Sequence, residues 1–203
     1  LATGLAAHGI ASLRYDKRTY VYGDRLTNDI TLDDEVITDA VAAVHLLEAR
    51  SDIARVVVVG HSLGGMLAPE IAARAGHIAA VAMLAPPARP PLVILRDQLR
   101  YLGAPREVLG QVEAALAVVE LAALGDDATS TVRVMGMPLS YWRDWEAHDG
   151  VAAASALRVP LLVLQGDRAS QVSGEDFAIW KRDVRRARCV LLAGDNHGFI
   201  RGR

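Results

Sequence analysis

The chain has 203 residues, enough for one sizeable hydrophobic core and too few for two ordinary domains. Hydrophobic residues make up 52% and charged residues 23%, so the chain can bury a core and is not intrinsically disordered. The formal net charge of −2 excludes an overall electrostatic attraction to nucleic acid or to an anionic membrane surface.

The single cysteine, Cys189, excludes an internal disulfide and lies in an apolar run, so we expect a buried strand residue rather than a nucleophile. It is compatible with a reducing compartment, and a cytoplasmic location is favoured over a secreted one. No apolar run approaches the roughly 20 residues that a membrane-spanning helix needs, and the sequence shows no signal peptide. We therefore expect no insertion into a membrane.

The chain opens with the pattern of a helix end over residues 1–8, which stops at Gly9. Because Leu1 is not a methionine, we expect the sequence to be a fragment that begins in mid-helix. Residues 9–15 then alternate as a strand does, and Asp16-Lys17-Arg18 leaves that strand as a charged loop.

A helix is predicted from Thr31 to about Arg50, because Thr31 is a typical N-cap, acidic residues fill the first turn and apolar residues follow at helical spacing. The consecutive valines Val56–Val59 then predict a buried parallel strand. This strand leads directly into Gly60-His61-Ser62-Leu63-Gly64, which fits the pattern G-x-S-x-G of a nucleophile elbow.

The glycines of this elbow have a chemical reason. A nucleophilic serine must sit on a tight, strained turn with its hydroxyl above the sheet, so the flanking positions cannot carry bulky side chains. The helix that follows, over residues 63–75, points its first amides at the reacting atom, and the Leu63 amide is the expected oxyanion donor. The alternative is an ordinary glycine-rich strand-to-helix turn, such as a nucleotide-binding loop, but no Lys-Ser/Thr follows as in a P-loop and G-x-G-x-x-G is absent.

Strands and helices alternate on both sides of a long helical stretch. Ile78–Ala85, residues 161–167 and Cys189–Leu192 predict further strands, and residues 174–188 are mostly helical. Such an alternation is typical of an α/β fold with a mostly parallel sheet and flanking helices.

Residues 88–156 interrupt this alternation with helical segments and no convincing strand. The segments are predicted at residues 92–102, 106–124, 140–145 and 151–157. We expect them to form a cap insertion over a core made of residues 1–87 and 157–203. The alternative is that they pack on the edge of the sheet.

A serine nucleophile needs a base, and the base needs an orienting carboxylate. His61 adjoins Ser62, so its side chain is expected to point away from the hydroxyl, and His148 lies in the cap insertion as a minor rival. His197 follows the last predicted strand, on the same carboxyl edge of the sheet as Ser62, where parallel strands deliver their exit loops. His197 is therefore the predicted base.

Several motifs together resemble a known family. They are the elbow over residues 60–65, the strand end over residues 14–18, Gln165-Gly166 with Gln171-Val172, and Asn196-His197. They look like the bacterial serine α/β-hydrolases, closest to the dienelactone-hydrolase-like and esterase branch. The resemblance covers nearly the whole length and implies an α/β-hydrolase fold that hydrolyses esters through an acyl-enzyme.

The resemblance also implies a triad acid three residues after the glycine that ends the next-to-last long strand, and that position is Ala169. An alanine cannot orient an imidazole. Asp167, on the same loop, is the substitute that we expect, while Glu175 and Asp176 are weaker candidates because of their helical context. Loss of a triad member costs on the order of 10⁴ in turnover and leaves residual catalysis.

A second departure from the family concerns the sheet. Three family strands precede the helix at which this chain begins, and the third of them lies between the strand at residues 9–15 and the valine strand. The loop after that third strand supplies the second oxyanion amide. We therefore expect residues 9–15 either to stay unpaired with Val56–Val59 or to pair with them directly, beside an incomplete oxyanion hole.

Aromatic residues of the cap insertion are candidates for a substrate pocket or, equally, for packing the insertion onto the sheet. They are Tyr101, Tyr141, Trp142 and Trp145. The first functional hypothesis is a serine hydrolase of small carboxylic esters, with no metal or organic cofactor. The second is a catalytically impaired protein of the same fold that binds a ligand or a partner through the cap pocket.

Overall fold

A parallel sheet forms the centre of the molecule. The computed structural model describes residues 1–23, 30–122 and 133–201. Its main sheet has four parallel strands in the order β1-β2-β5-β6, with the bounds Val57–His61 (β1), Ala80–Leu84 (β2), Leu161–Gly166 (β5) and Arg188–Leu192 (β6). The predicted α/β class with a parallel sheet and flanking helices is confirmed.

Three helices cover one face of this sheet: α4 (Leu63–Ala75), α8 (Gly150–Ala156) and α9 (Gly174–Asp183). α4 packs on β1, β2 and α8, and α8 in turn contacts α9. The core between helices and sheet includes the fully buried side chains of Met83, Val163 and Trp180. The α8 segment, which we expected within the cap insertion, thus packs in the same layer as α4 and α9.

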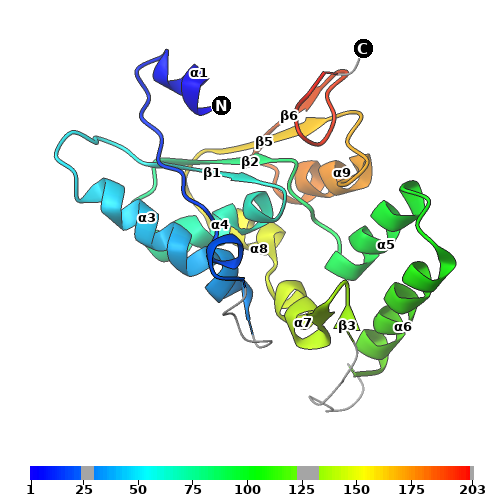
Figure 1. Cartoon of the computed structure of the whole chain (residues 1–203). Coiled ribbons are helices and arrows are strands. Elements are labelled where there is room, and N and C mark those ends of the chain that lie inside the picture. Colours follow the sequence, from blue (N-terminus) through cyan, green and yellow to red (C-terminus); the bar gives the residue numbers. More distant parts are fainter. Residues whose placement is uncertain (24–29, 123–132, 202–203) are drawn as a thin grey trace.

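The opposite face of the sheet is open at β1. Val57 and Val59 alternate with inward-facing neighbours and are 49% and 44% exposed. Figure 1 shows the helices gathered on one side of the sheet, while α1 (Ala2–Ala6), which has no buried residue, stands apart on the other side. Both faces of a parallel sheet are normally covered, so this exposure is unusual for the architecture.

The strand predicted over residues 9–15 is wrong. Residues 10–17 have no regular structure, and Ile10, Leu13 and Tyr15 are exposed. Within the described residues, β1 pairs with β2 alone, so no ladder of hydrogen bonds holds residues 9–15 extended. Of the two arrangements that we expected, the unpaired one is found.

The helix predicted from Thr31 divides into a π-helical turn, η2 (Asp33–Ile37), and α3 (Thr38–Glu48). Thr31 Oγ1 accepts a hydrogen bond from the Asp34 amide at 3.2 Å, and Asp34 Oδ2 accepts one from the Thr31 amide at 3.2 Å. This reciprocal pair caps the helix as predicted. The short helix α2 (Arg18–Val21) joins α3 through the Arg18–Asp39 ion pair.

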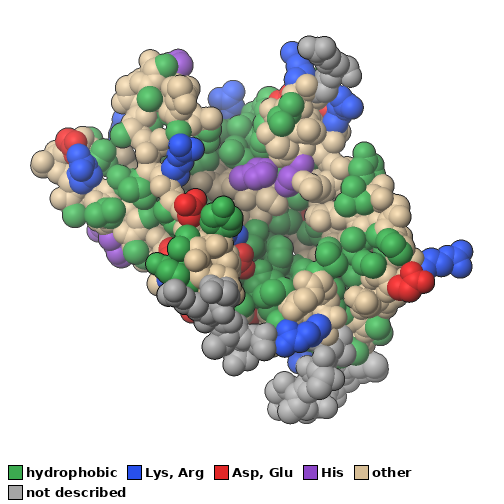
Figure 2. All heavy atoms as spheres, in the orientation of Figure 1, with side chains coloured by type: hydrophobic (Ala, Val, Ile, Leu, Met, Phe, Trp, Pro, Cys, Tyr) green, Lys and Arg blue, Asp and Glu red, His purple; other side chains and the backbone are tan. Residues whose placement is uncertain are grey.

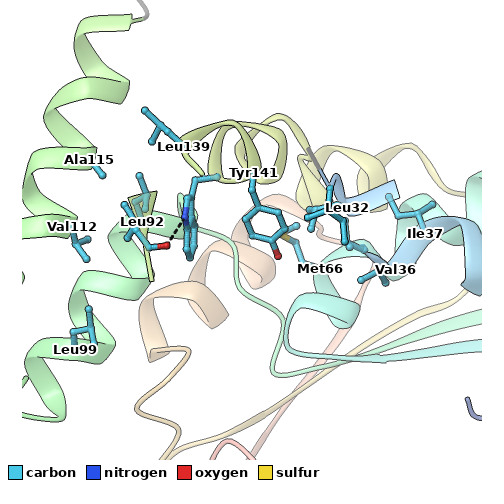
Figure 3. Close-up of a cluster of buried hydrophobic side chains, with 14 of the residues drawn as sticks. Leu32, Val36, Ile37, Met66, Leu92, Leu99, Val112, Ala115, Leu139 and Tyr141 are labelled. Atoms are coloured by element: carbon cyan, nitrogen blue, oxygen red, sulfur yellow. Dashed lines mark hydrogen bonds between the residues drawn. The ribbon is translucent and has the colours of Figure 1, made fainter. Parts of the chain in front are cut away.

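The cap insertion is mainly helical, with α5 (Pro91–Tyr101), α6 (Arg106–Ala122) and α7 (Leu139–Ala147). The expectation that it holds no strand is wrong, because β3 (Arg133–Val134) and β4 (Met137–Pro138) form a hairpin. Strands of two residues are too short to show an alternating pattern in the sequence. Figure 3 shows the core of this region, where α5 and α6 face each other and Tyr141 of α7 points toward Leu32 and Met66.

Candidate active site

The elbow has the strained geometry that a nucleophile needs. Ser62 has a φ of 55°, in a region that non-glycine residues rarely adopt. Its amide donates to Leu84 O at 2.8 Å, and its carbonyl accepts from the Met66 amide at 3.0 Å. A Cβ on Gly60 would lie 1.9 Å from Gly64 O, so only glycine fits there. The residues therefore fold locally as the sequence pattern predicts.

The candidate oxyanion donor lies at the start of a long helix. Leu63 is the first residue of α4, and amides of a first helical turn have no acceptor within their own helix. The N-terminal end of the helix dipole adds a partial positive charge at this point. The Leu63 amide is therefore suitably placed beside Ser62 to stabilise a developing negative charge.

His197 lies on a compact loop after β6. Asn196 Oδ1 accepts hydrogen bonds from the Gly198 and Ile200 amides, each at 3.0 Å, and so closes the loop. His61 Nε2 donates to His197 O at 2.9 Å, and the two rings lie 4.7 Å apart, which attaches the loop to the elbow. Figure 2 shows a pair of adjacent histidine side chains at the rim of a hollow with hydrophobic side chains on its floor.

The ring of His197 makes no hydrogen bond within the described residues. Its Nδ1 atom is buried and has no hydrogen-bond partner among the described residues. Burial of the ring, with a smaller contribution from His61, lowers the pKa of His197 to about 4. The imidazole is therefore neutral at neutral pH and able to accept a proton. In the described part of the chain, no hydrogen bond joins His197 to Ser62.

Asp167 is not the partner of His197 Nδ1, which corrects our expectation for the triad acid. Its side chain is exposed, and Asp167 Oδ1 accepts a hydrogen bond from the Gly194 amide at 2.8 Å. The carboxylate thus braces the turn that follows β6 and makes no hydrogen bond to the imidazole. Ala169, on the same loop, is buried and carries no polar side chain.

The weaker acid candidates, Glu175 and Asp176, are engaged by Arg89. Asp176 is fully buried and accepts hydrogen bonds from the Ala88 amide at 3.0 Å and from Arg89 Nη2 at 3.1 Å. Burial alone would raise the pKa of Asp176, but the hydrogen bonds and the charge of Arg89 outweigh it and hold the pKa below its usual range. Glu175 pairs with Arg89 Nη1 at 3.0 Å. Both carboxylates therefore serve to join α9 to the start of the cap insertion.

His148, the minor rival for the base, has other partners. Its Nδ1 lies 2.7 Å from Glu70 Oε2, and its Nε2 lies 3.9 Å from Asp144 Oδ2. These contacts connect the end of α7 to the middle of α4. The structure therefore gives His148 a role in joining elements and leaves His197 as the candidate base.

The aromatic residues of the cap insertion separate into two groups. Tyr141 and Trp142 are buried, and they donate hydrogen bonds to Glu35 Oε2 at 2.7 Å and to Val134 O at 3.3 Å. Trp145 stacks on Trp142 and contacts Met66, at the side of a separate pocket of about 330 Å³. These three side chains pack the insertion, and Tyr101 alone of the four lines the pocket that contains His197.

This second pocket, of about 240 Å³, includes residues that sequence reasoning missed. Besides Tyr101 and His197 it is lined by Gln98, Leu102, Ser170, Gln171, Asn196 and Gly198. Gln171 and Asn196 belong to the motifs that resembled a family, but no sequence signal marked Gln98 or Ser170. Gln98 Nε2 donates to Gln171 O at 2.7 Å, which brings α5 to the loop after β5.

Two further observations concern the described residues only. None of their histidine, cysteine and acidic side chains forms a group of three that is suited to hold a metal ion. None of their helices combines the length and the hydropathy of a membrane span.

Comparison with known proteins adds a family and several relatives. A model described as the alpha/beta hydrolase family matches residues 1–201. Esterase EstD from Thermotoga maritima is 39% identical over 205 aligned positions, which take in 100% of this chain and 49% of that protein. The chain thus spans about half the length of this curated relative.

Solved structures with lower identity share the fold. Est1E from Butyrivibrio proteoclasticus has a TM-score of 0.59 and 20% identity, over 84% of this chain and 64% of that one. The esterase domain of a Rhodothermus marinus protein has a TM-score of 0.53 and 22% identity, over 83% of this chain and 62% of that one. At such identities, the similarity shows a shared fold and nothing about activity.

Proposed function

Because the chain belongs to the alpha/beta hydrolase family, we propose that it is a serine hydrolase that cleaves small carboxylic esters through an acyl-enzyme on Ser62. One observation carries the proposal: a strained serine at the start of α4 stands beside a loop that holds a neutral, half-buried histidine. The esterase among the relatives supports the choice of ester substrates.

The proposed reaction has two steps. In the first, His197 takes the proton of Ser62 while the serine oxygen bonds to the ester carbonyl carbon, and the Leu63 amide donates to the oxyanion. The bond from that carbon to the alcohol oxygen then breaks, and the proton passes from His197 to the leaving alcohol. In the second step, water activated by His197 releases the acid and restores Ser62. Neither step requires a metal or an organic cofactor.

A second candidate is a hydrolase-fold protein that binds a ligand without turning it over efficiently. The specific observation in its favour is the buried Nδ1 of His197 without a partner. A serine hydrolase whose histidine is not oriented by a carboxylate turns over on the order of 10⁴ more slowly than one with a complete triad, although catalysis above the uncatalysed rate persists. The two candidates therefore differ in rate by several orders of magnitude, which a covalent probe distinguishes.

Labelling with a fluorophosphonate tests the proposal. The wild-type chain is expected to react at a single residue, identified as Ser62 by peptide mass analysis, and Ser62→Ala is expected to abolish the reaction. Leu46→Ala, at an exposed position of α3, is the matched control and should label like the wild type. Absence of labelling in a folded wild-type protein would reject the hydrolase and favour the binding role.

A further inference from the structure

The pocket beside His197 has two walls from different parts of the chain. One wall is the last turn of α5, with Gln98 and Tyr101, and the other is the loop after β5, with Ser170 and Gln171. The hydrogen bond from Gln98 Nε2 to Gln171 O holds the two walls together. The pocket is thus defined by tertiary structure, because α5 and the loop after β5 are distant in the sequence and both determine its shape.

The position of the pocket indicates which half of the ester, acyl or alcohol, it would hold. His197 lines it, whereas Ser62 and the oxyanion donor Leu63 do not. In a serine hydrolase, the histidine gives its proton to the leaving group, and the serine and the oxyanion donors hold the acyl half. A group that occupies this pocket therefore belongs to the leaving alcohol.

The lining combines several polar side chains with apolar surface and carries no full charge. None of the residues that line it is an aspartate, glutamate, lysine or arginine, and burial keeps His197 neutral. Several polar atoms have unused hydrogen-bonding capacity. Within the described residues, the Ser170 and Gln171 side chains have no partner, and Asn196, whose Oδ1 accepts two hydrogen bonds, keeps both Nδ2 protons free. An uncharged group with several hydroxyls would satisfy these donors and acceptors.

The rim and the size of the pocket add two limits. Tyr101 and Leu102 are 71% and 72% exposed, so they present apolar surface at the entrance. A tyrosine face suits the apolar side of a ring that carries hydroxyls at its edge. The volume of about 240 Å³ is below the roughly 300–1,000 Å³ of pockets that hold drug-sized ligands, which favours a single small ring.

We infer that this pocket holds the alcohol half of the ester and selects a neutral, hydroxyl-rich alcohol of about one sugar ring. The inference rests on the proposed function, since it assigns the leaving group of that reaction. The acyl carbon bonds to Ser62 as its bond to the sugar oxygen breaks, and that oxygen takes the proton from His197. The free sugar then leaves through the rim formed by Tyr101 and Leu102.

Two acetates with the same acyl group and ring size test this selection. Methyl 6-O-acetyl-glucopyranoside presents hydroxyls to the pocket, and cyclohexylmethyl acetate presents none. We expect kcat/KM of the wild type to be about tenfold higher for the glucoside, because each added hydrogen bond to a neutral group contributes about 2- to 10-fold. The cationic 6-O-acetylglucosamine is expected to be hydrolysed more slowly than the glucoside, since the lining offers no carboxylate.

The matched variant is Gln171→Leu, which removes the amide, keeps the side-chain size and leaves the backbone carbonyl that Gln98 contacts. It should lower kcat/KM for the glucoside about 2- to 10-fold more than kcat/KM for cyclohexylmethyl acetate. The control Leu46→Ala should change neither. The fluorophosphonate labelling rate of Leu46→Ala should equal that of the wild type, and labelling of Gln171→Leu at Ser62 shows that the variant is folded with a reactive serine.

The outcomes distinguish a failure of the proposed function from a failure of the inference about the pocket. If wild-type protein neither labels nor hydrolyses any ester, the proposed function fails, and the inference fails with it. If it labels and hydrolyses both acetates, but kcat/KM is equal or favours the cyclohexyl ester, the inference is overturned and the proposed function stands. Equal losses for both esters in Gln171→Leu would also overturn it, because they would indicate a change in the fold of the loop.

Discussion

At the scale of single residues, the site combines a strained serine with a histidine that is held by its backbone carbonyl and not by its ring. His61 attaches the His197 carbonyl to the elbow, while the ring nitrogen Nδ1 has no partner among the described residues. In a complete triad, a carboxylate would both orient the ring and stabilise its protonated form. The ring is therefore expected to stay unprotonated down to unusually low pH, and general-base catalysis by it is expected to be slow.

The pH dependence of the wild type follows from this environment. Burial lowers the pKa of His197 to about 4, from an ordinary value near 6.5. The neutral, proton-accepting form of the ring therefore persists as the pH falls from 6.5 to about 4. The acidic limb of kcat/KM should then have its midpoint well below pH 6, in rate measurements from pH 3.5 to 8. A midpoint at 6.5 or above would show that the ring is solvated.

Ala169→Asp should supply the missing carboxylate. We expect turnover at pH 8 to rise at least tenfold, because triad members act together and their loss costs on the order of 10⁴. The acidic limb should move to higher pH, since a neighbouring carboxylate stabilises the imidazolium and raises its pKa. Ala169→Asn is the control, with similar size and no charge, and should give neither effect. An unchanged pH profile in the aspartate variant would contradict this account of Nδ1.

At the scale of elements, the elbow depends on the close approach of β1 and α4. A Cβ on Gly60 would overlap the backbone of Gly64, whereas a Cβ on Gly64 would meet no atom within 4 Å. The two glycines of one motif therefore have different tasks: the first permits packing, and the second lies at an open helical position.

Alanine substitutions distinguish these tasks. Gly60→Ala should lower the free energy of unfolding by about 3 kcal/mol or more, because backbone atoms cannot yield to the new methyl group. Gly64→Ala should leave it unchanged or raise it by up to about 1 kcal/mol, since alanine favours the helix. Urea unfolding monitored by circular dichroism measures both. Similar losses in the two variants would show that the turn, and not the Gly60 contact, is the sensitive feature.

The elements that the sequence predicted well are those with a complete local signal. β-Branched residues, glycines and helix-forming residues follow one another here, and the valine strand, the elbow and α4 all occur where we expected them. The expected burial of the valine strand is wrong, because Val57 and Val59 are exposed on the open face. Residues 9–15 carried a strand pattern but lacked a strand to pair with, and pairing is a property of distant residues. The prediction of Asp167 as the triad acid is wrong for a related reason. Its carboxylate accepts a hydrogen bond from the distant Gly194 amide, and no local pattern in the sequence indicates that contact.

At the scale of the whole molecule, the sheet has one well-covered face and one partly open face. The accessible surface is 12158 Å², about a third more than the roughly 9,200 Å² that a folded monomer of this mass usually has. The exposed valines of β1 contribute to this excess. The site lies at the carboxyl ends of the strands. Its elbow leads into α4, which packs on the covered face of the sheet.

Truncations on the two faces of the sheet should differ in cost. Val163→Ala removes methyl groups from a fully buried side chain and should lower the free energy of unfolding by about 2 kcal/mol or more. Val59→Ala, at a position 44% exposed, should cost less than about 1 kcal/mol. Both are measured by urea unfolding at a fixed protein concentration. Equal costs would mean that in solution the open face is covered as well as the helical one.

The open face also has a calorimetric consequence. With this surface, folding removes about 61% of the area that the unfolded chain exposes, instead of about 70% for an ordinary domain of this length. The heat-capacity increase on unfolding scales with the apolar area exposed, so it should fall about one eighth below the usual 12–15 cal/mol/K per residue. A smaller heat-capacity change flattens the curve of stability against temperature, which spreads whatever stability the chain has over a wider thermal range.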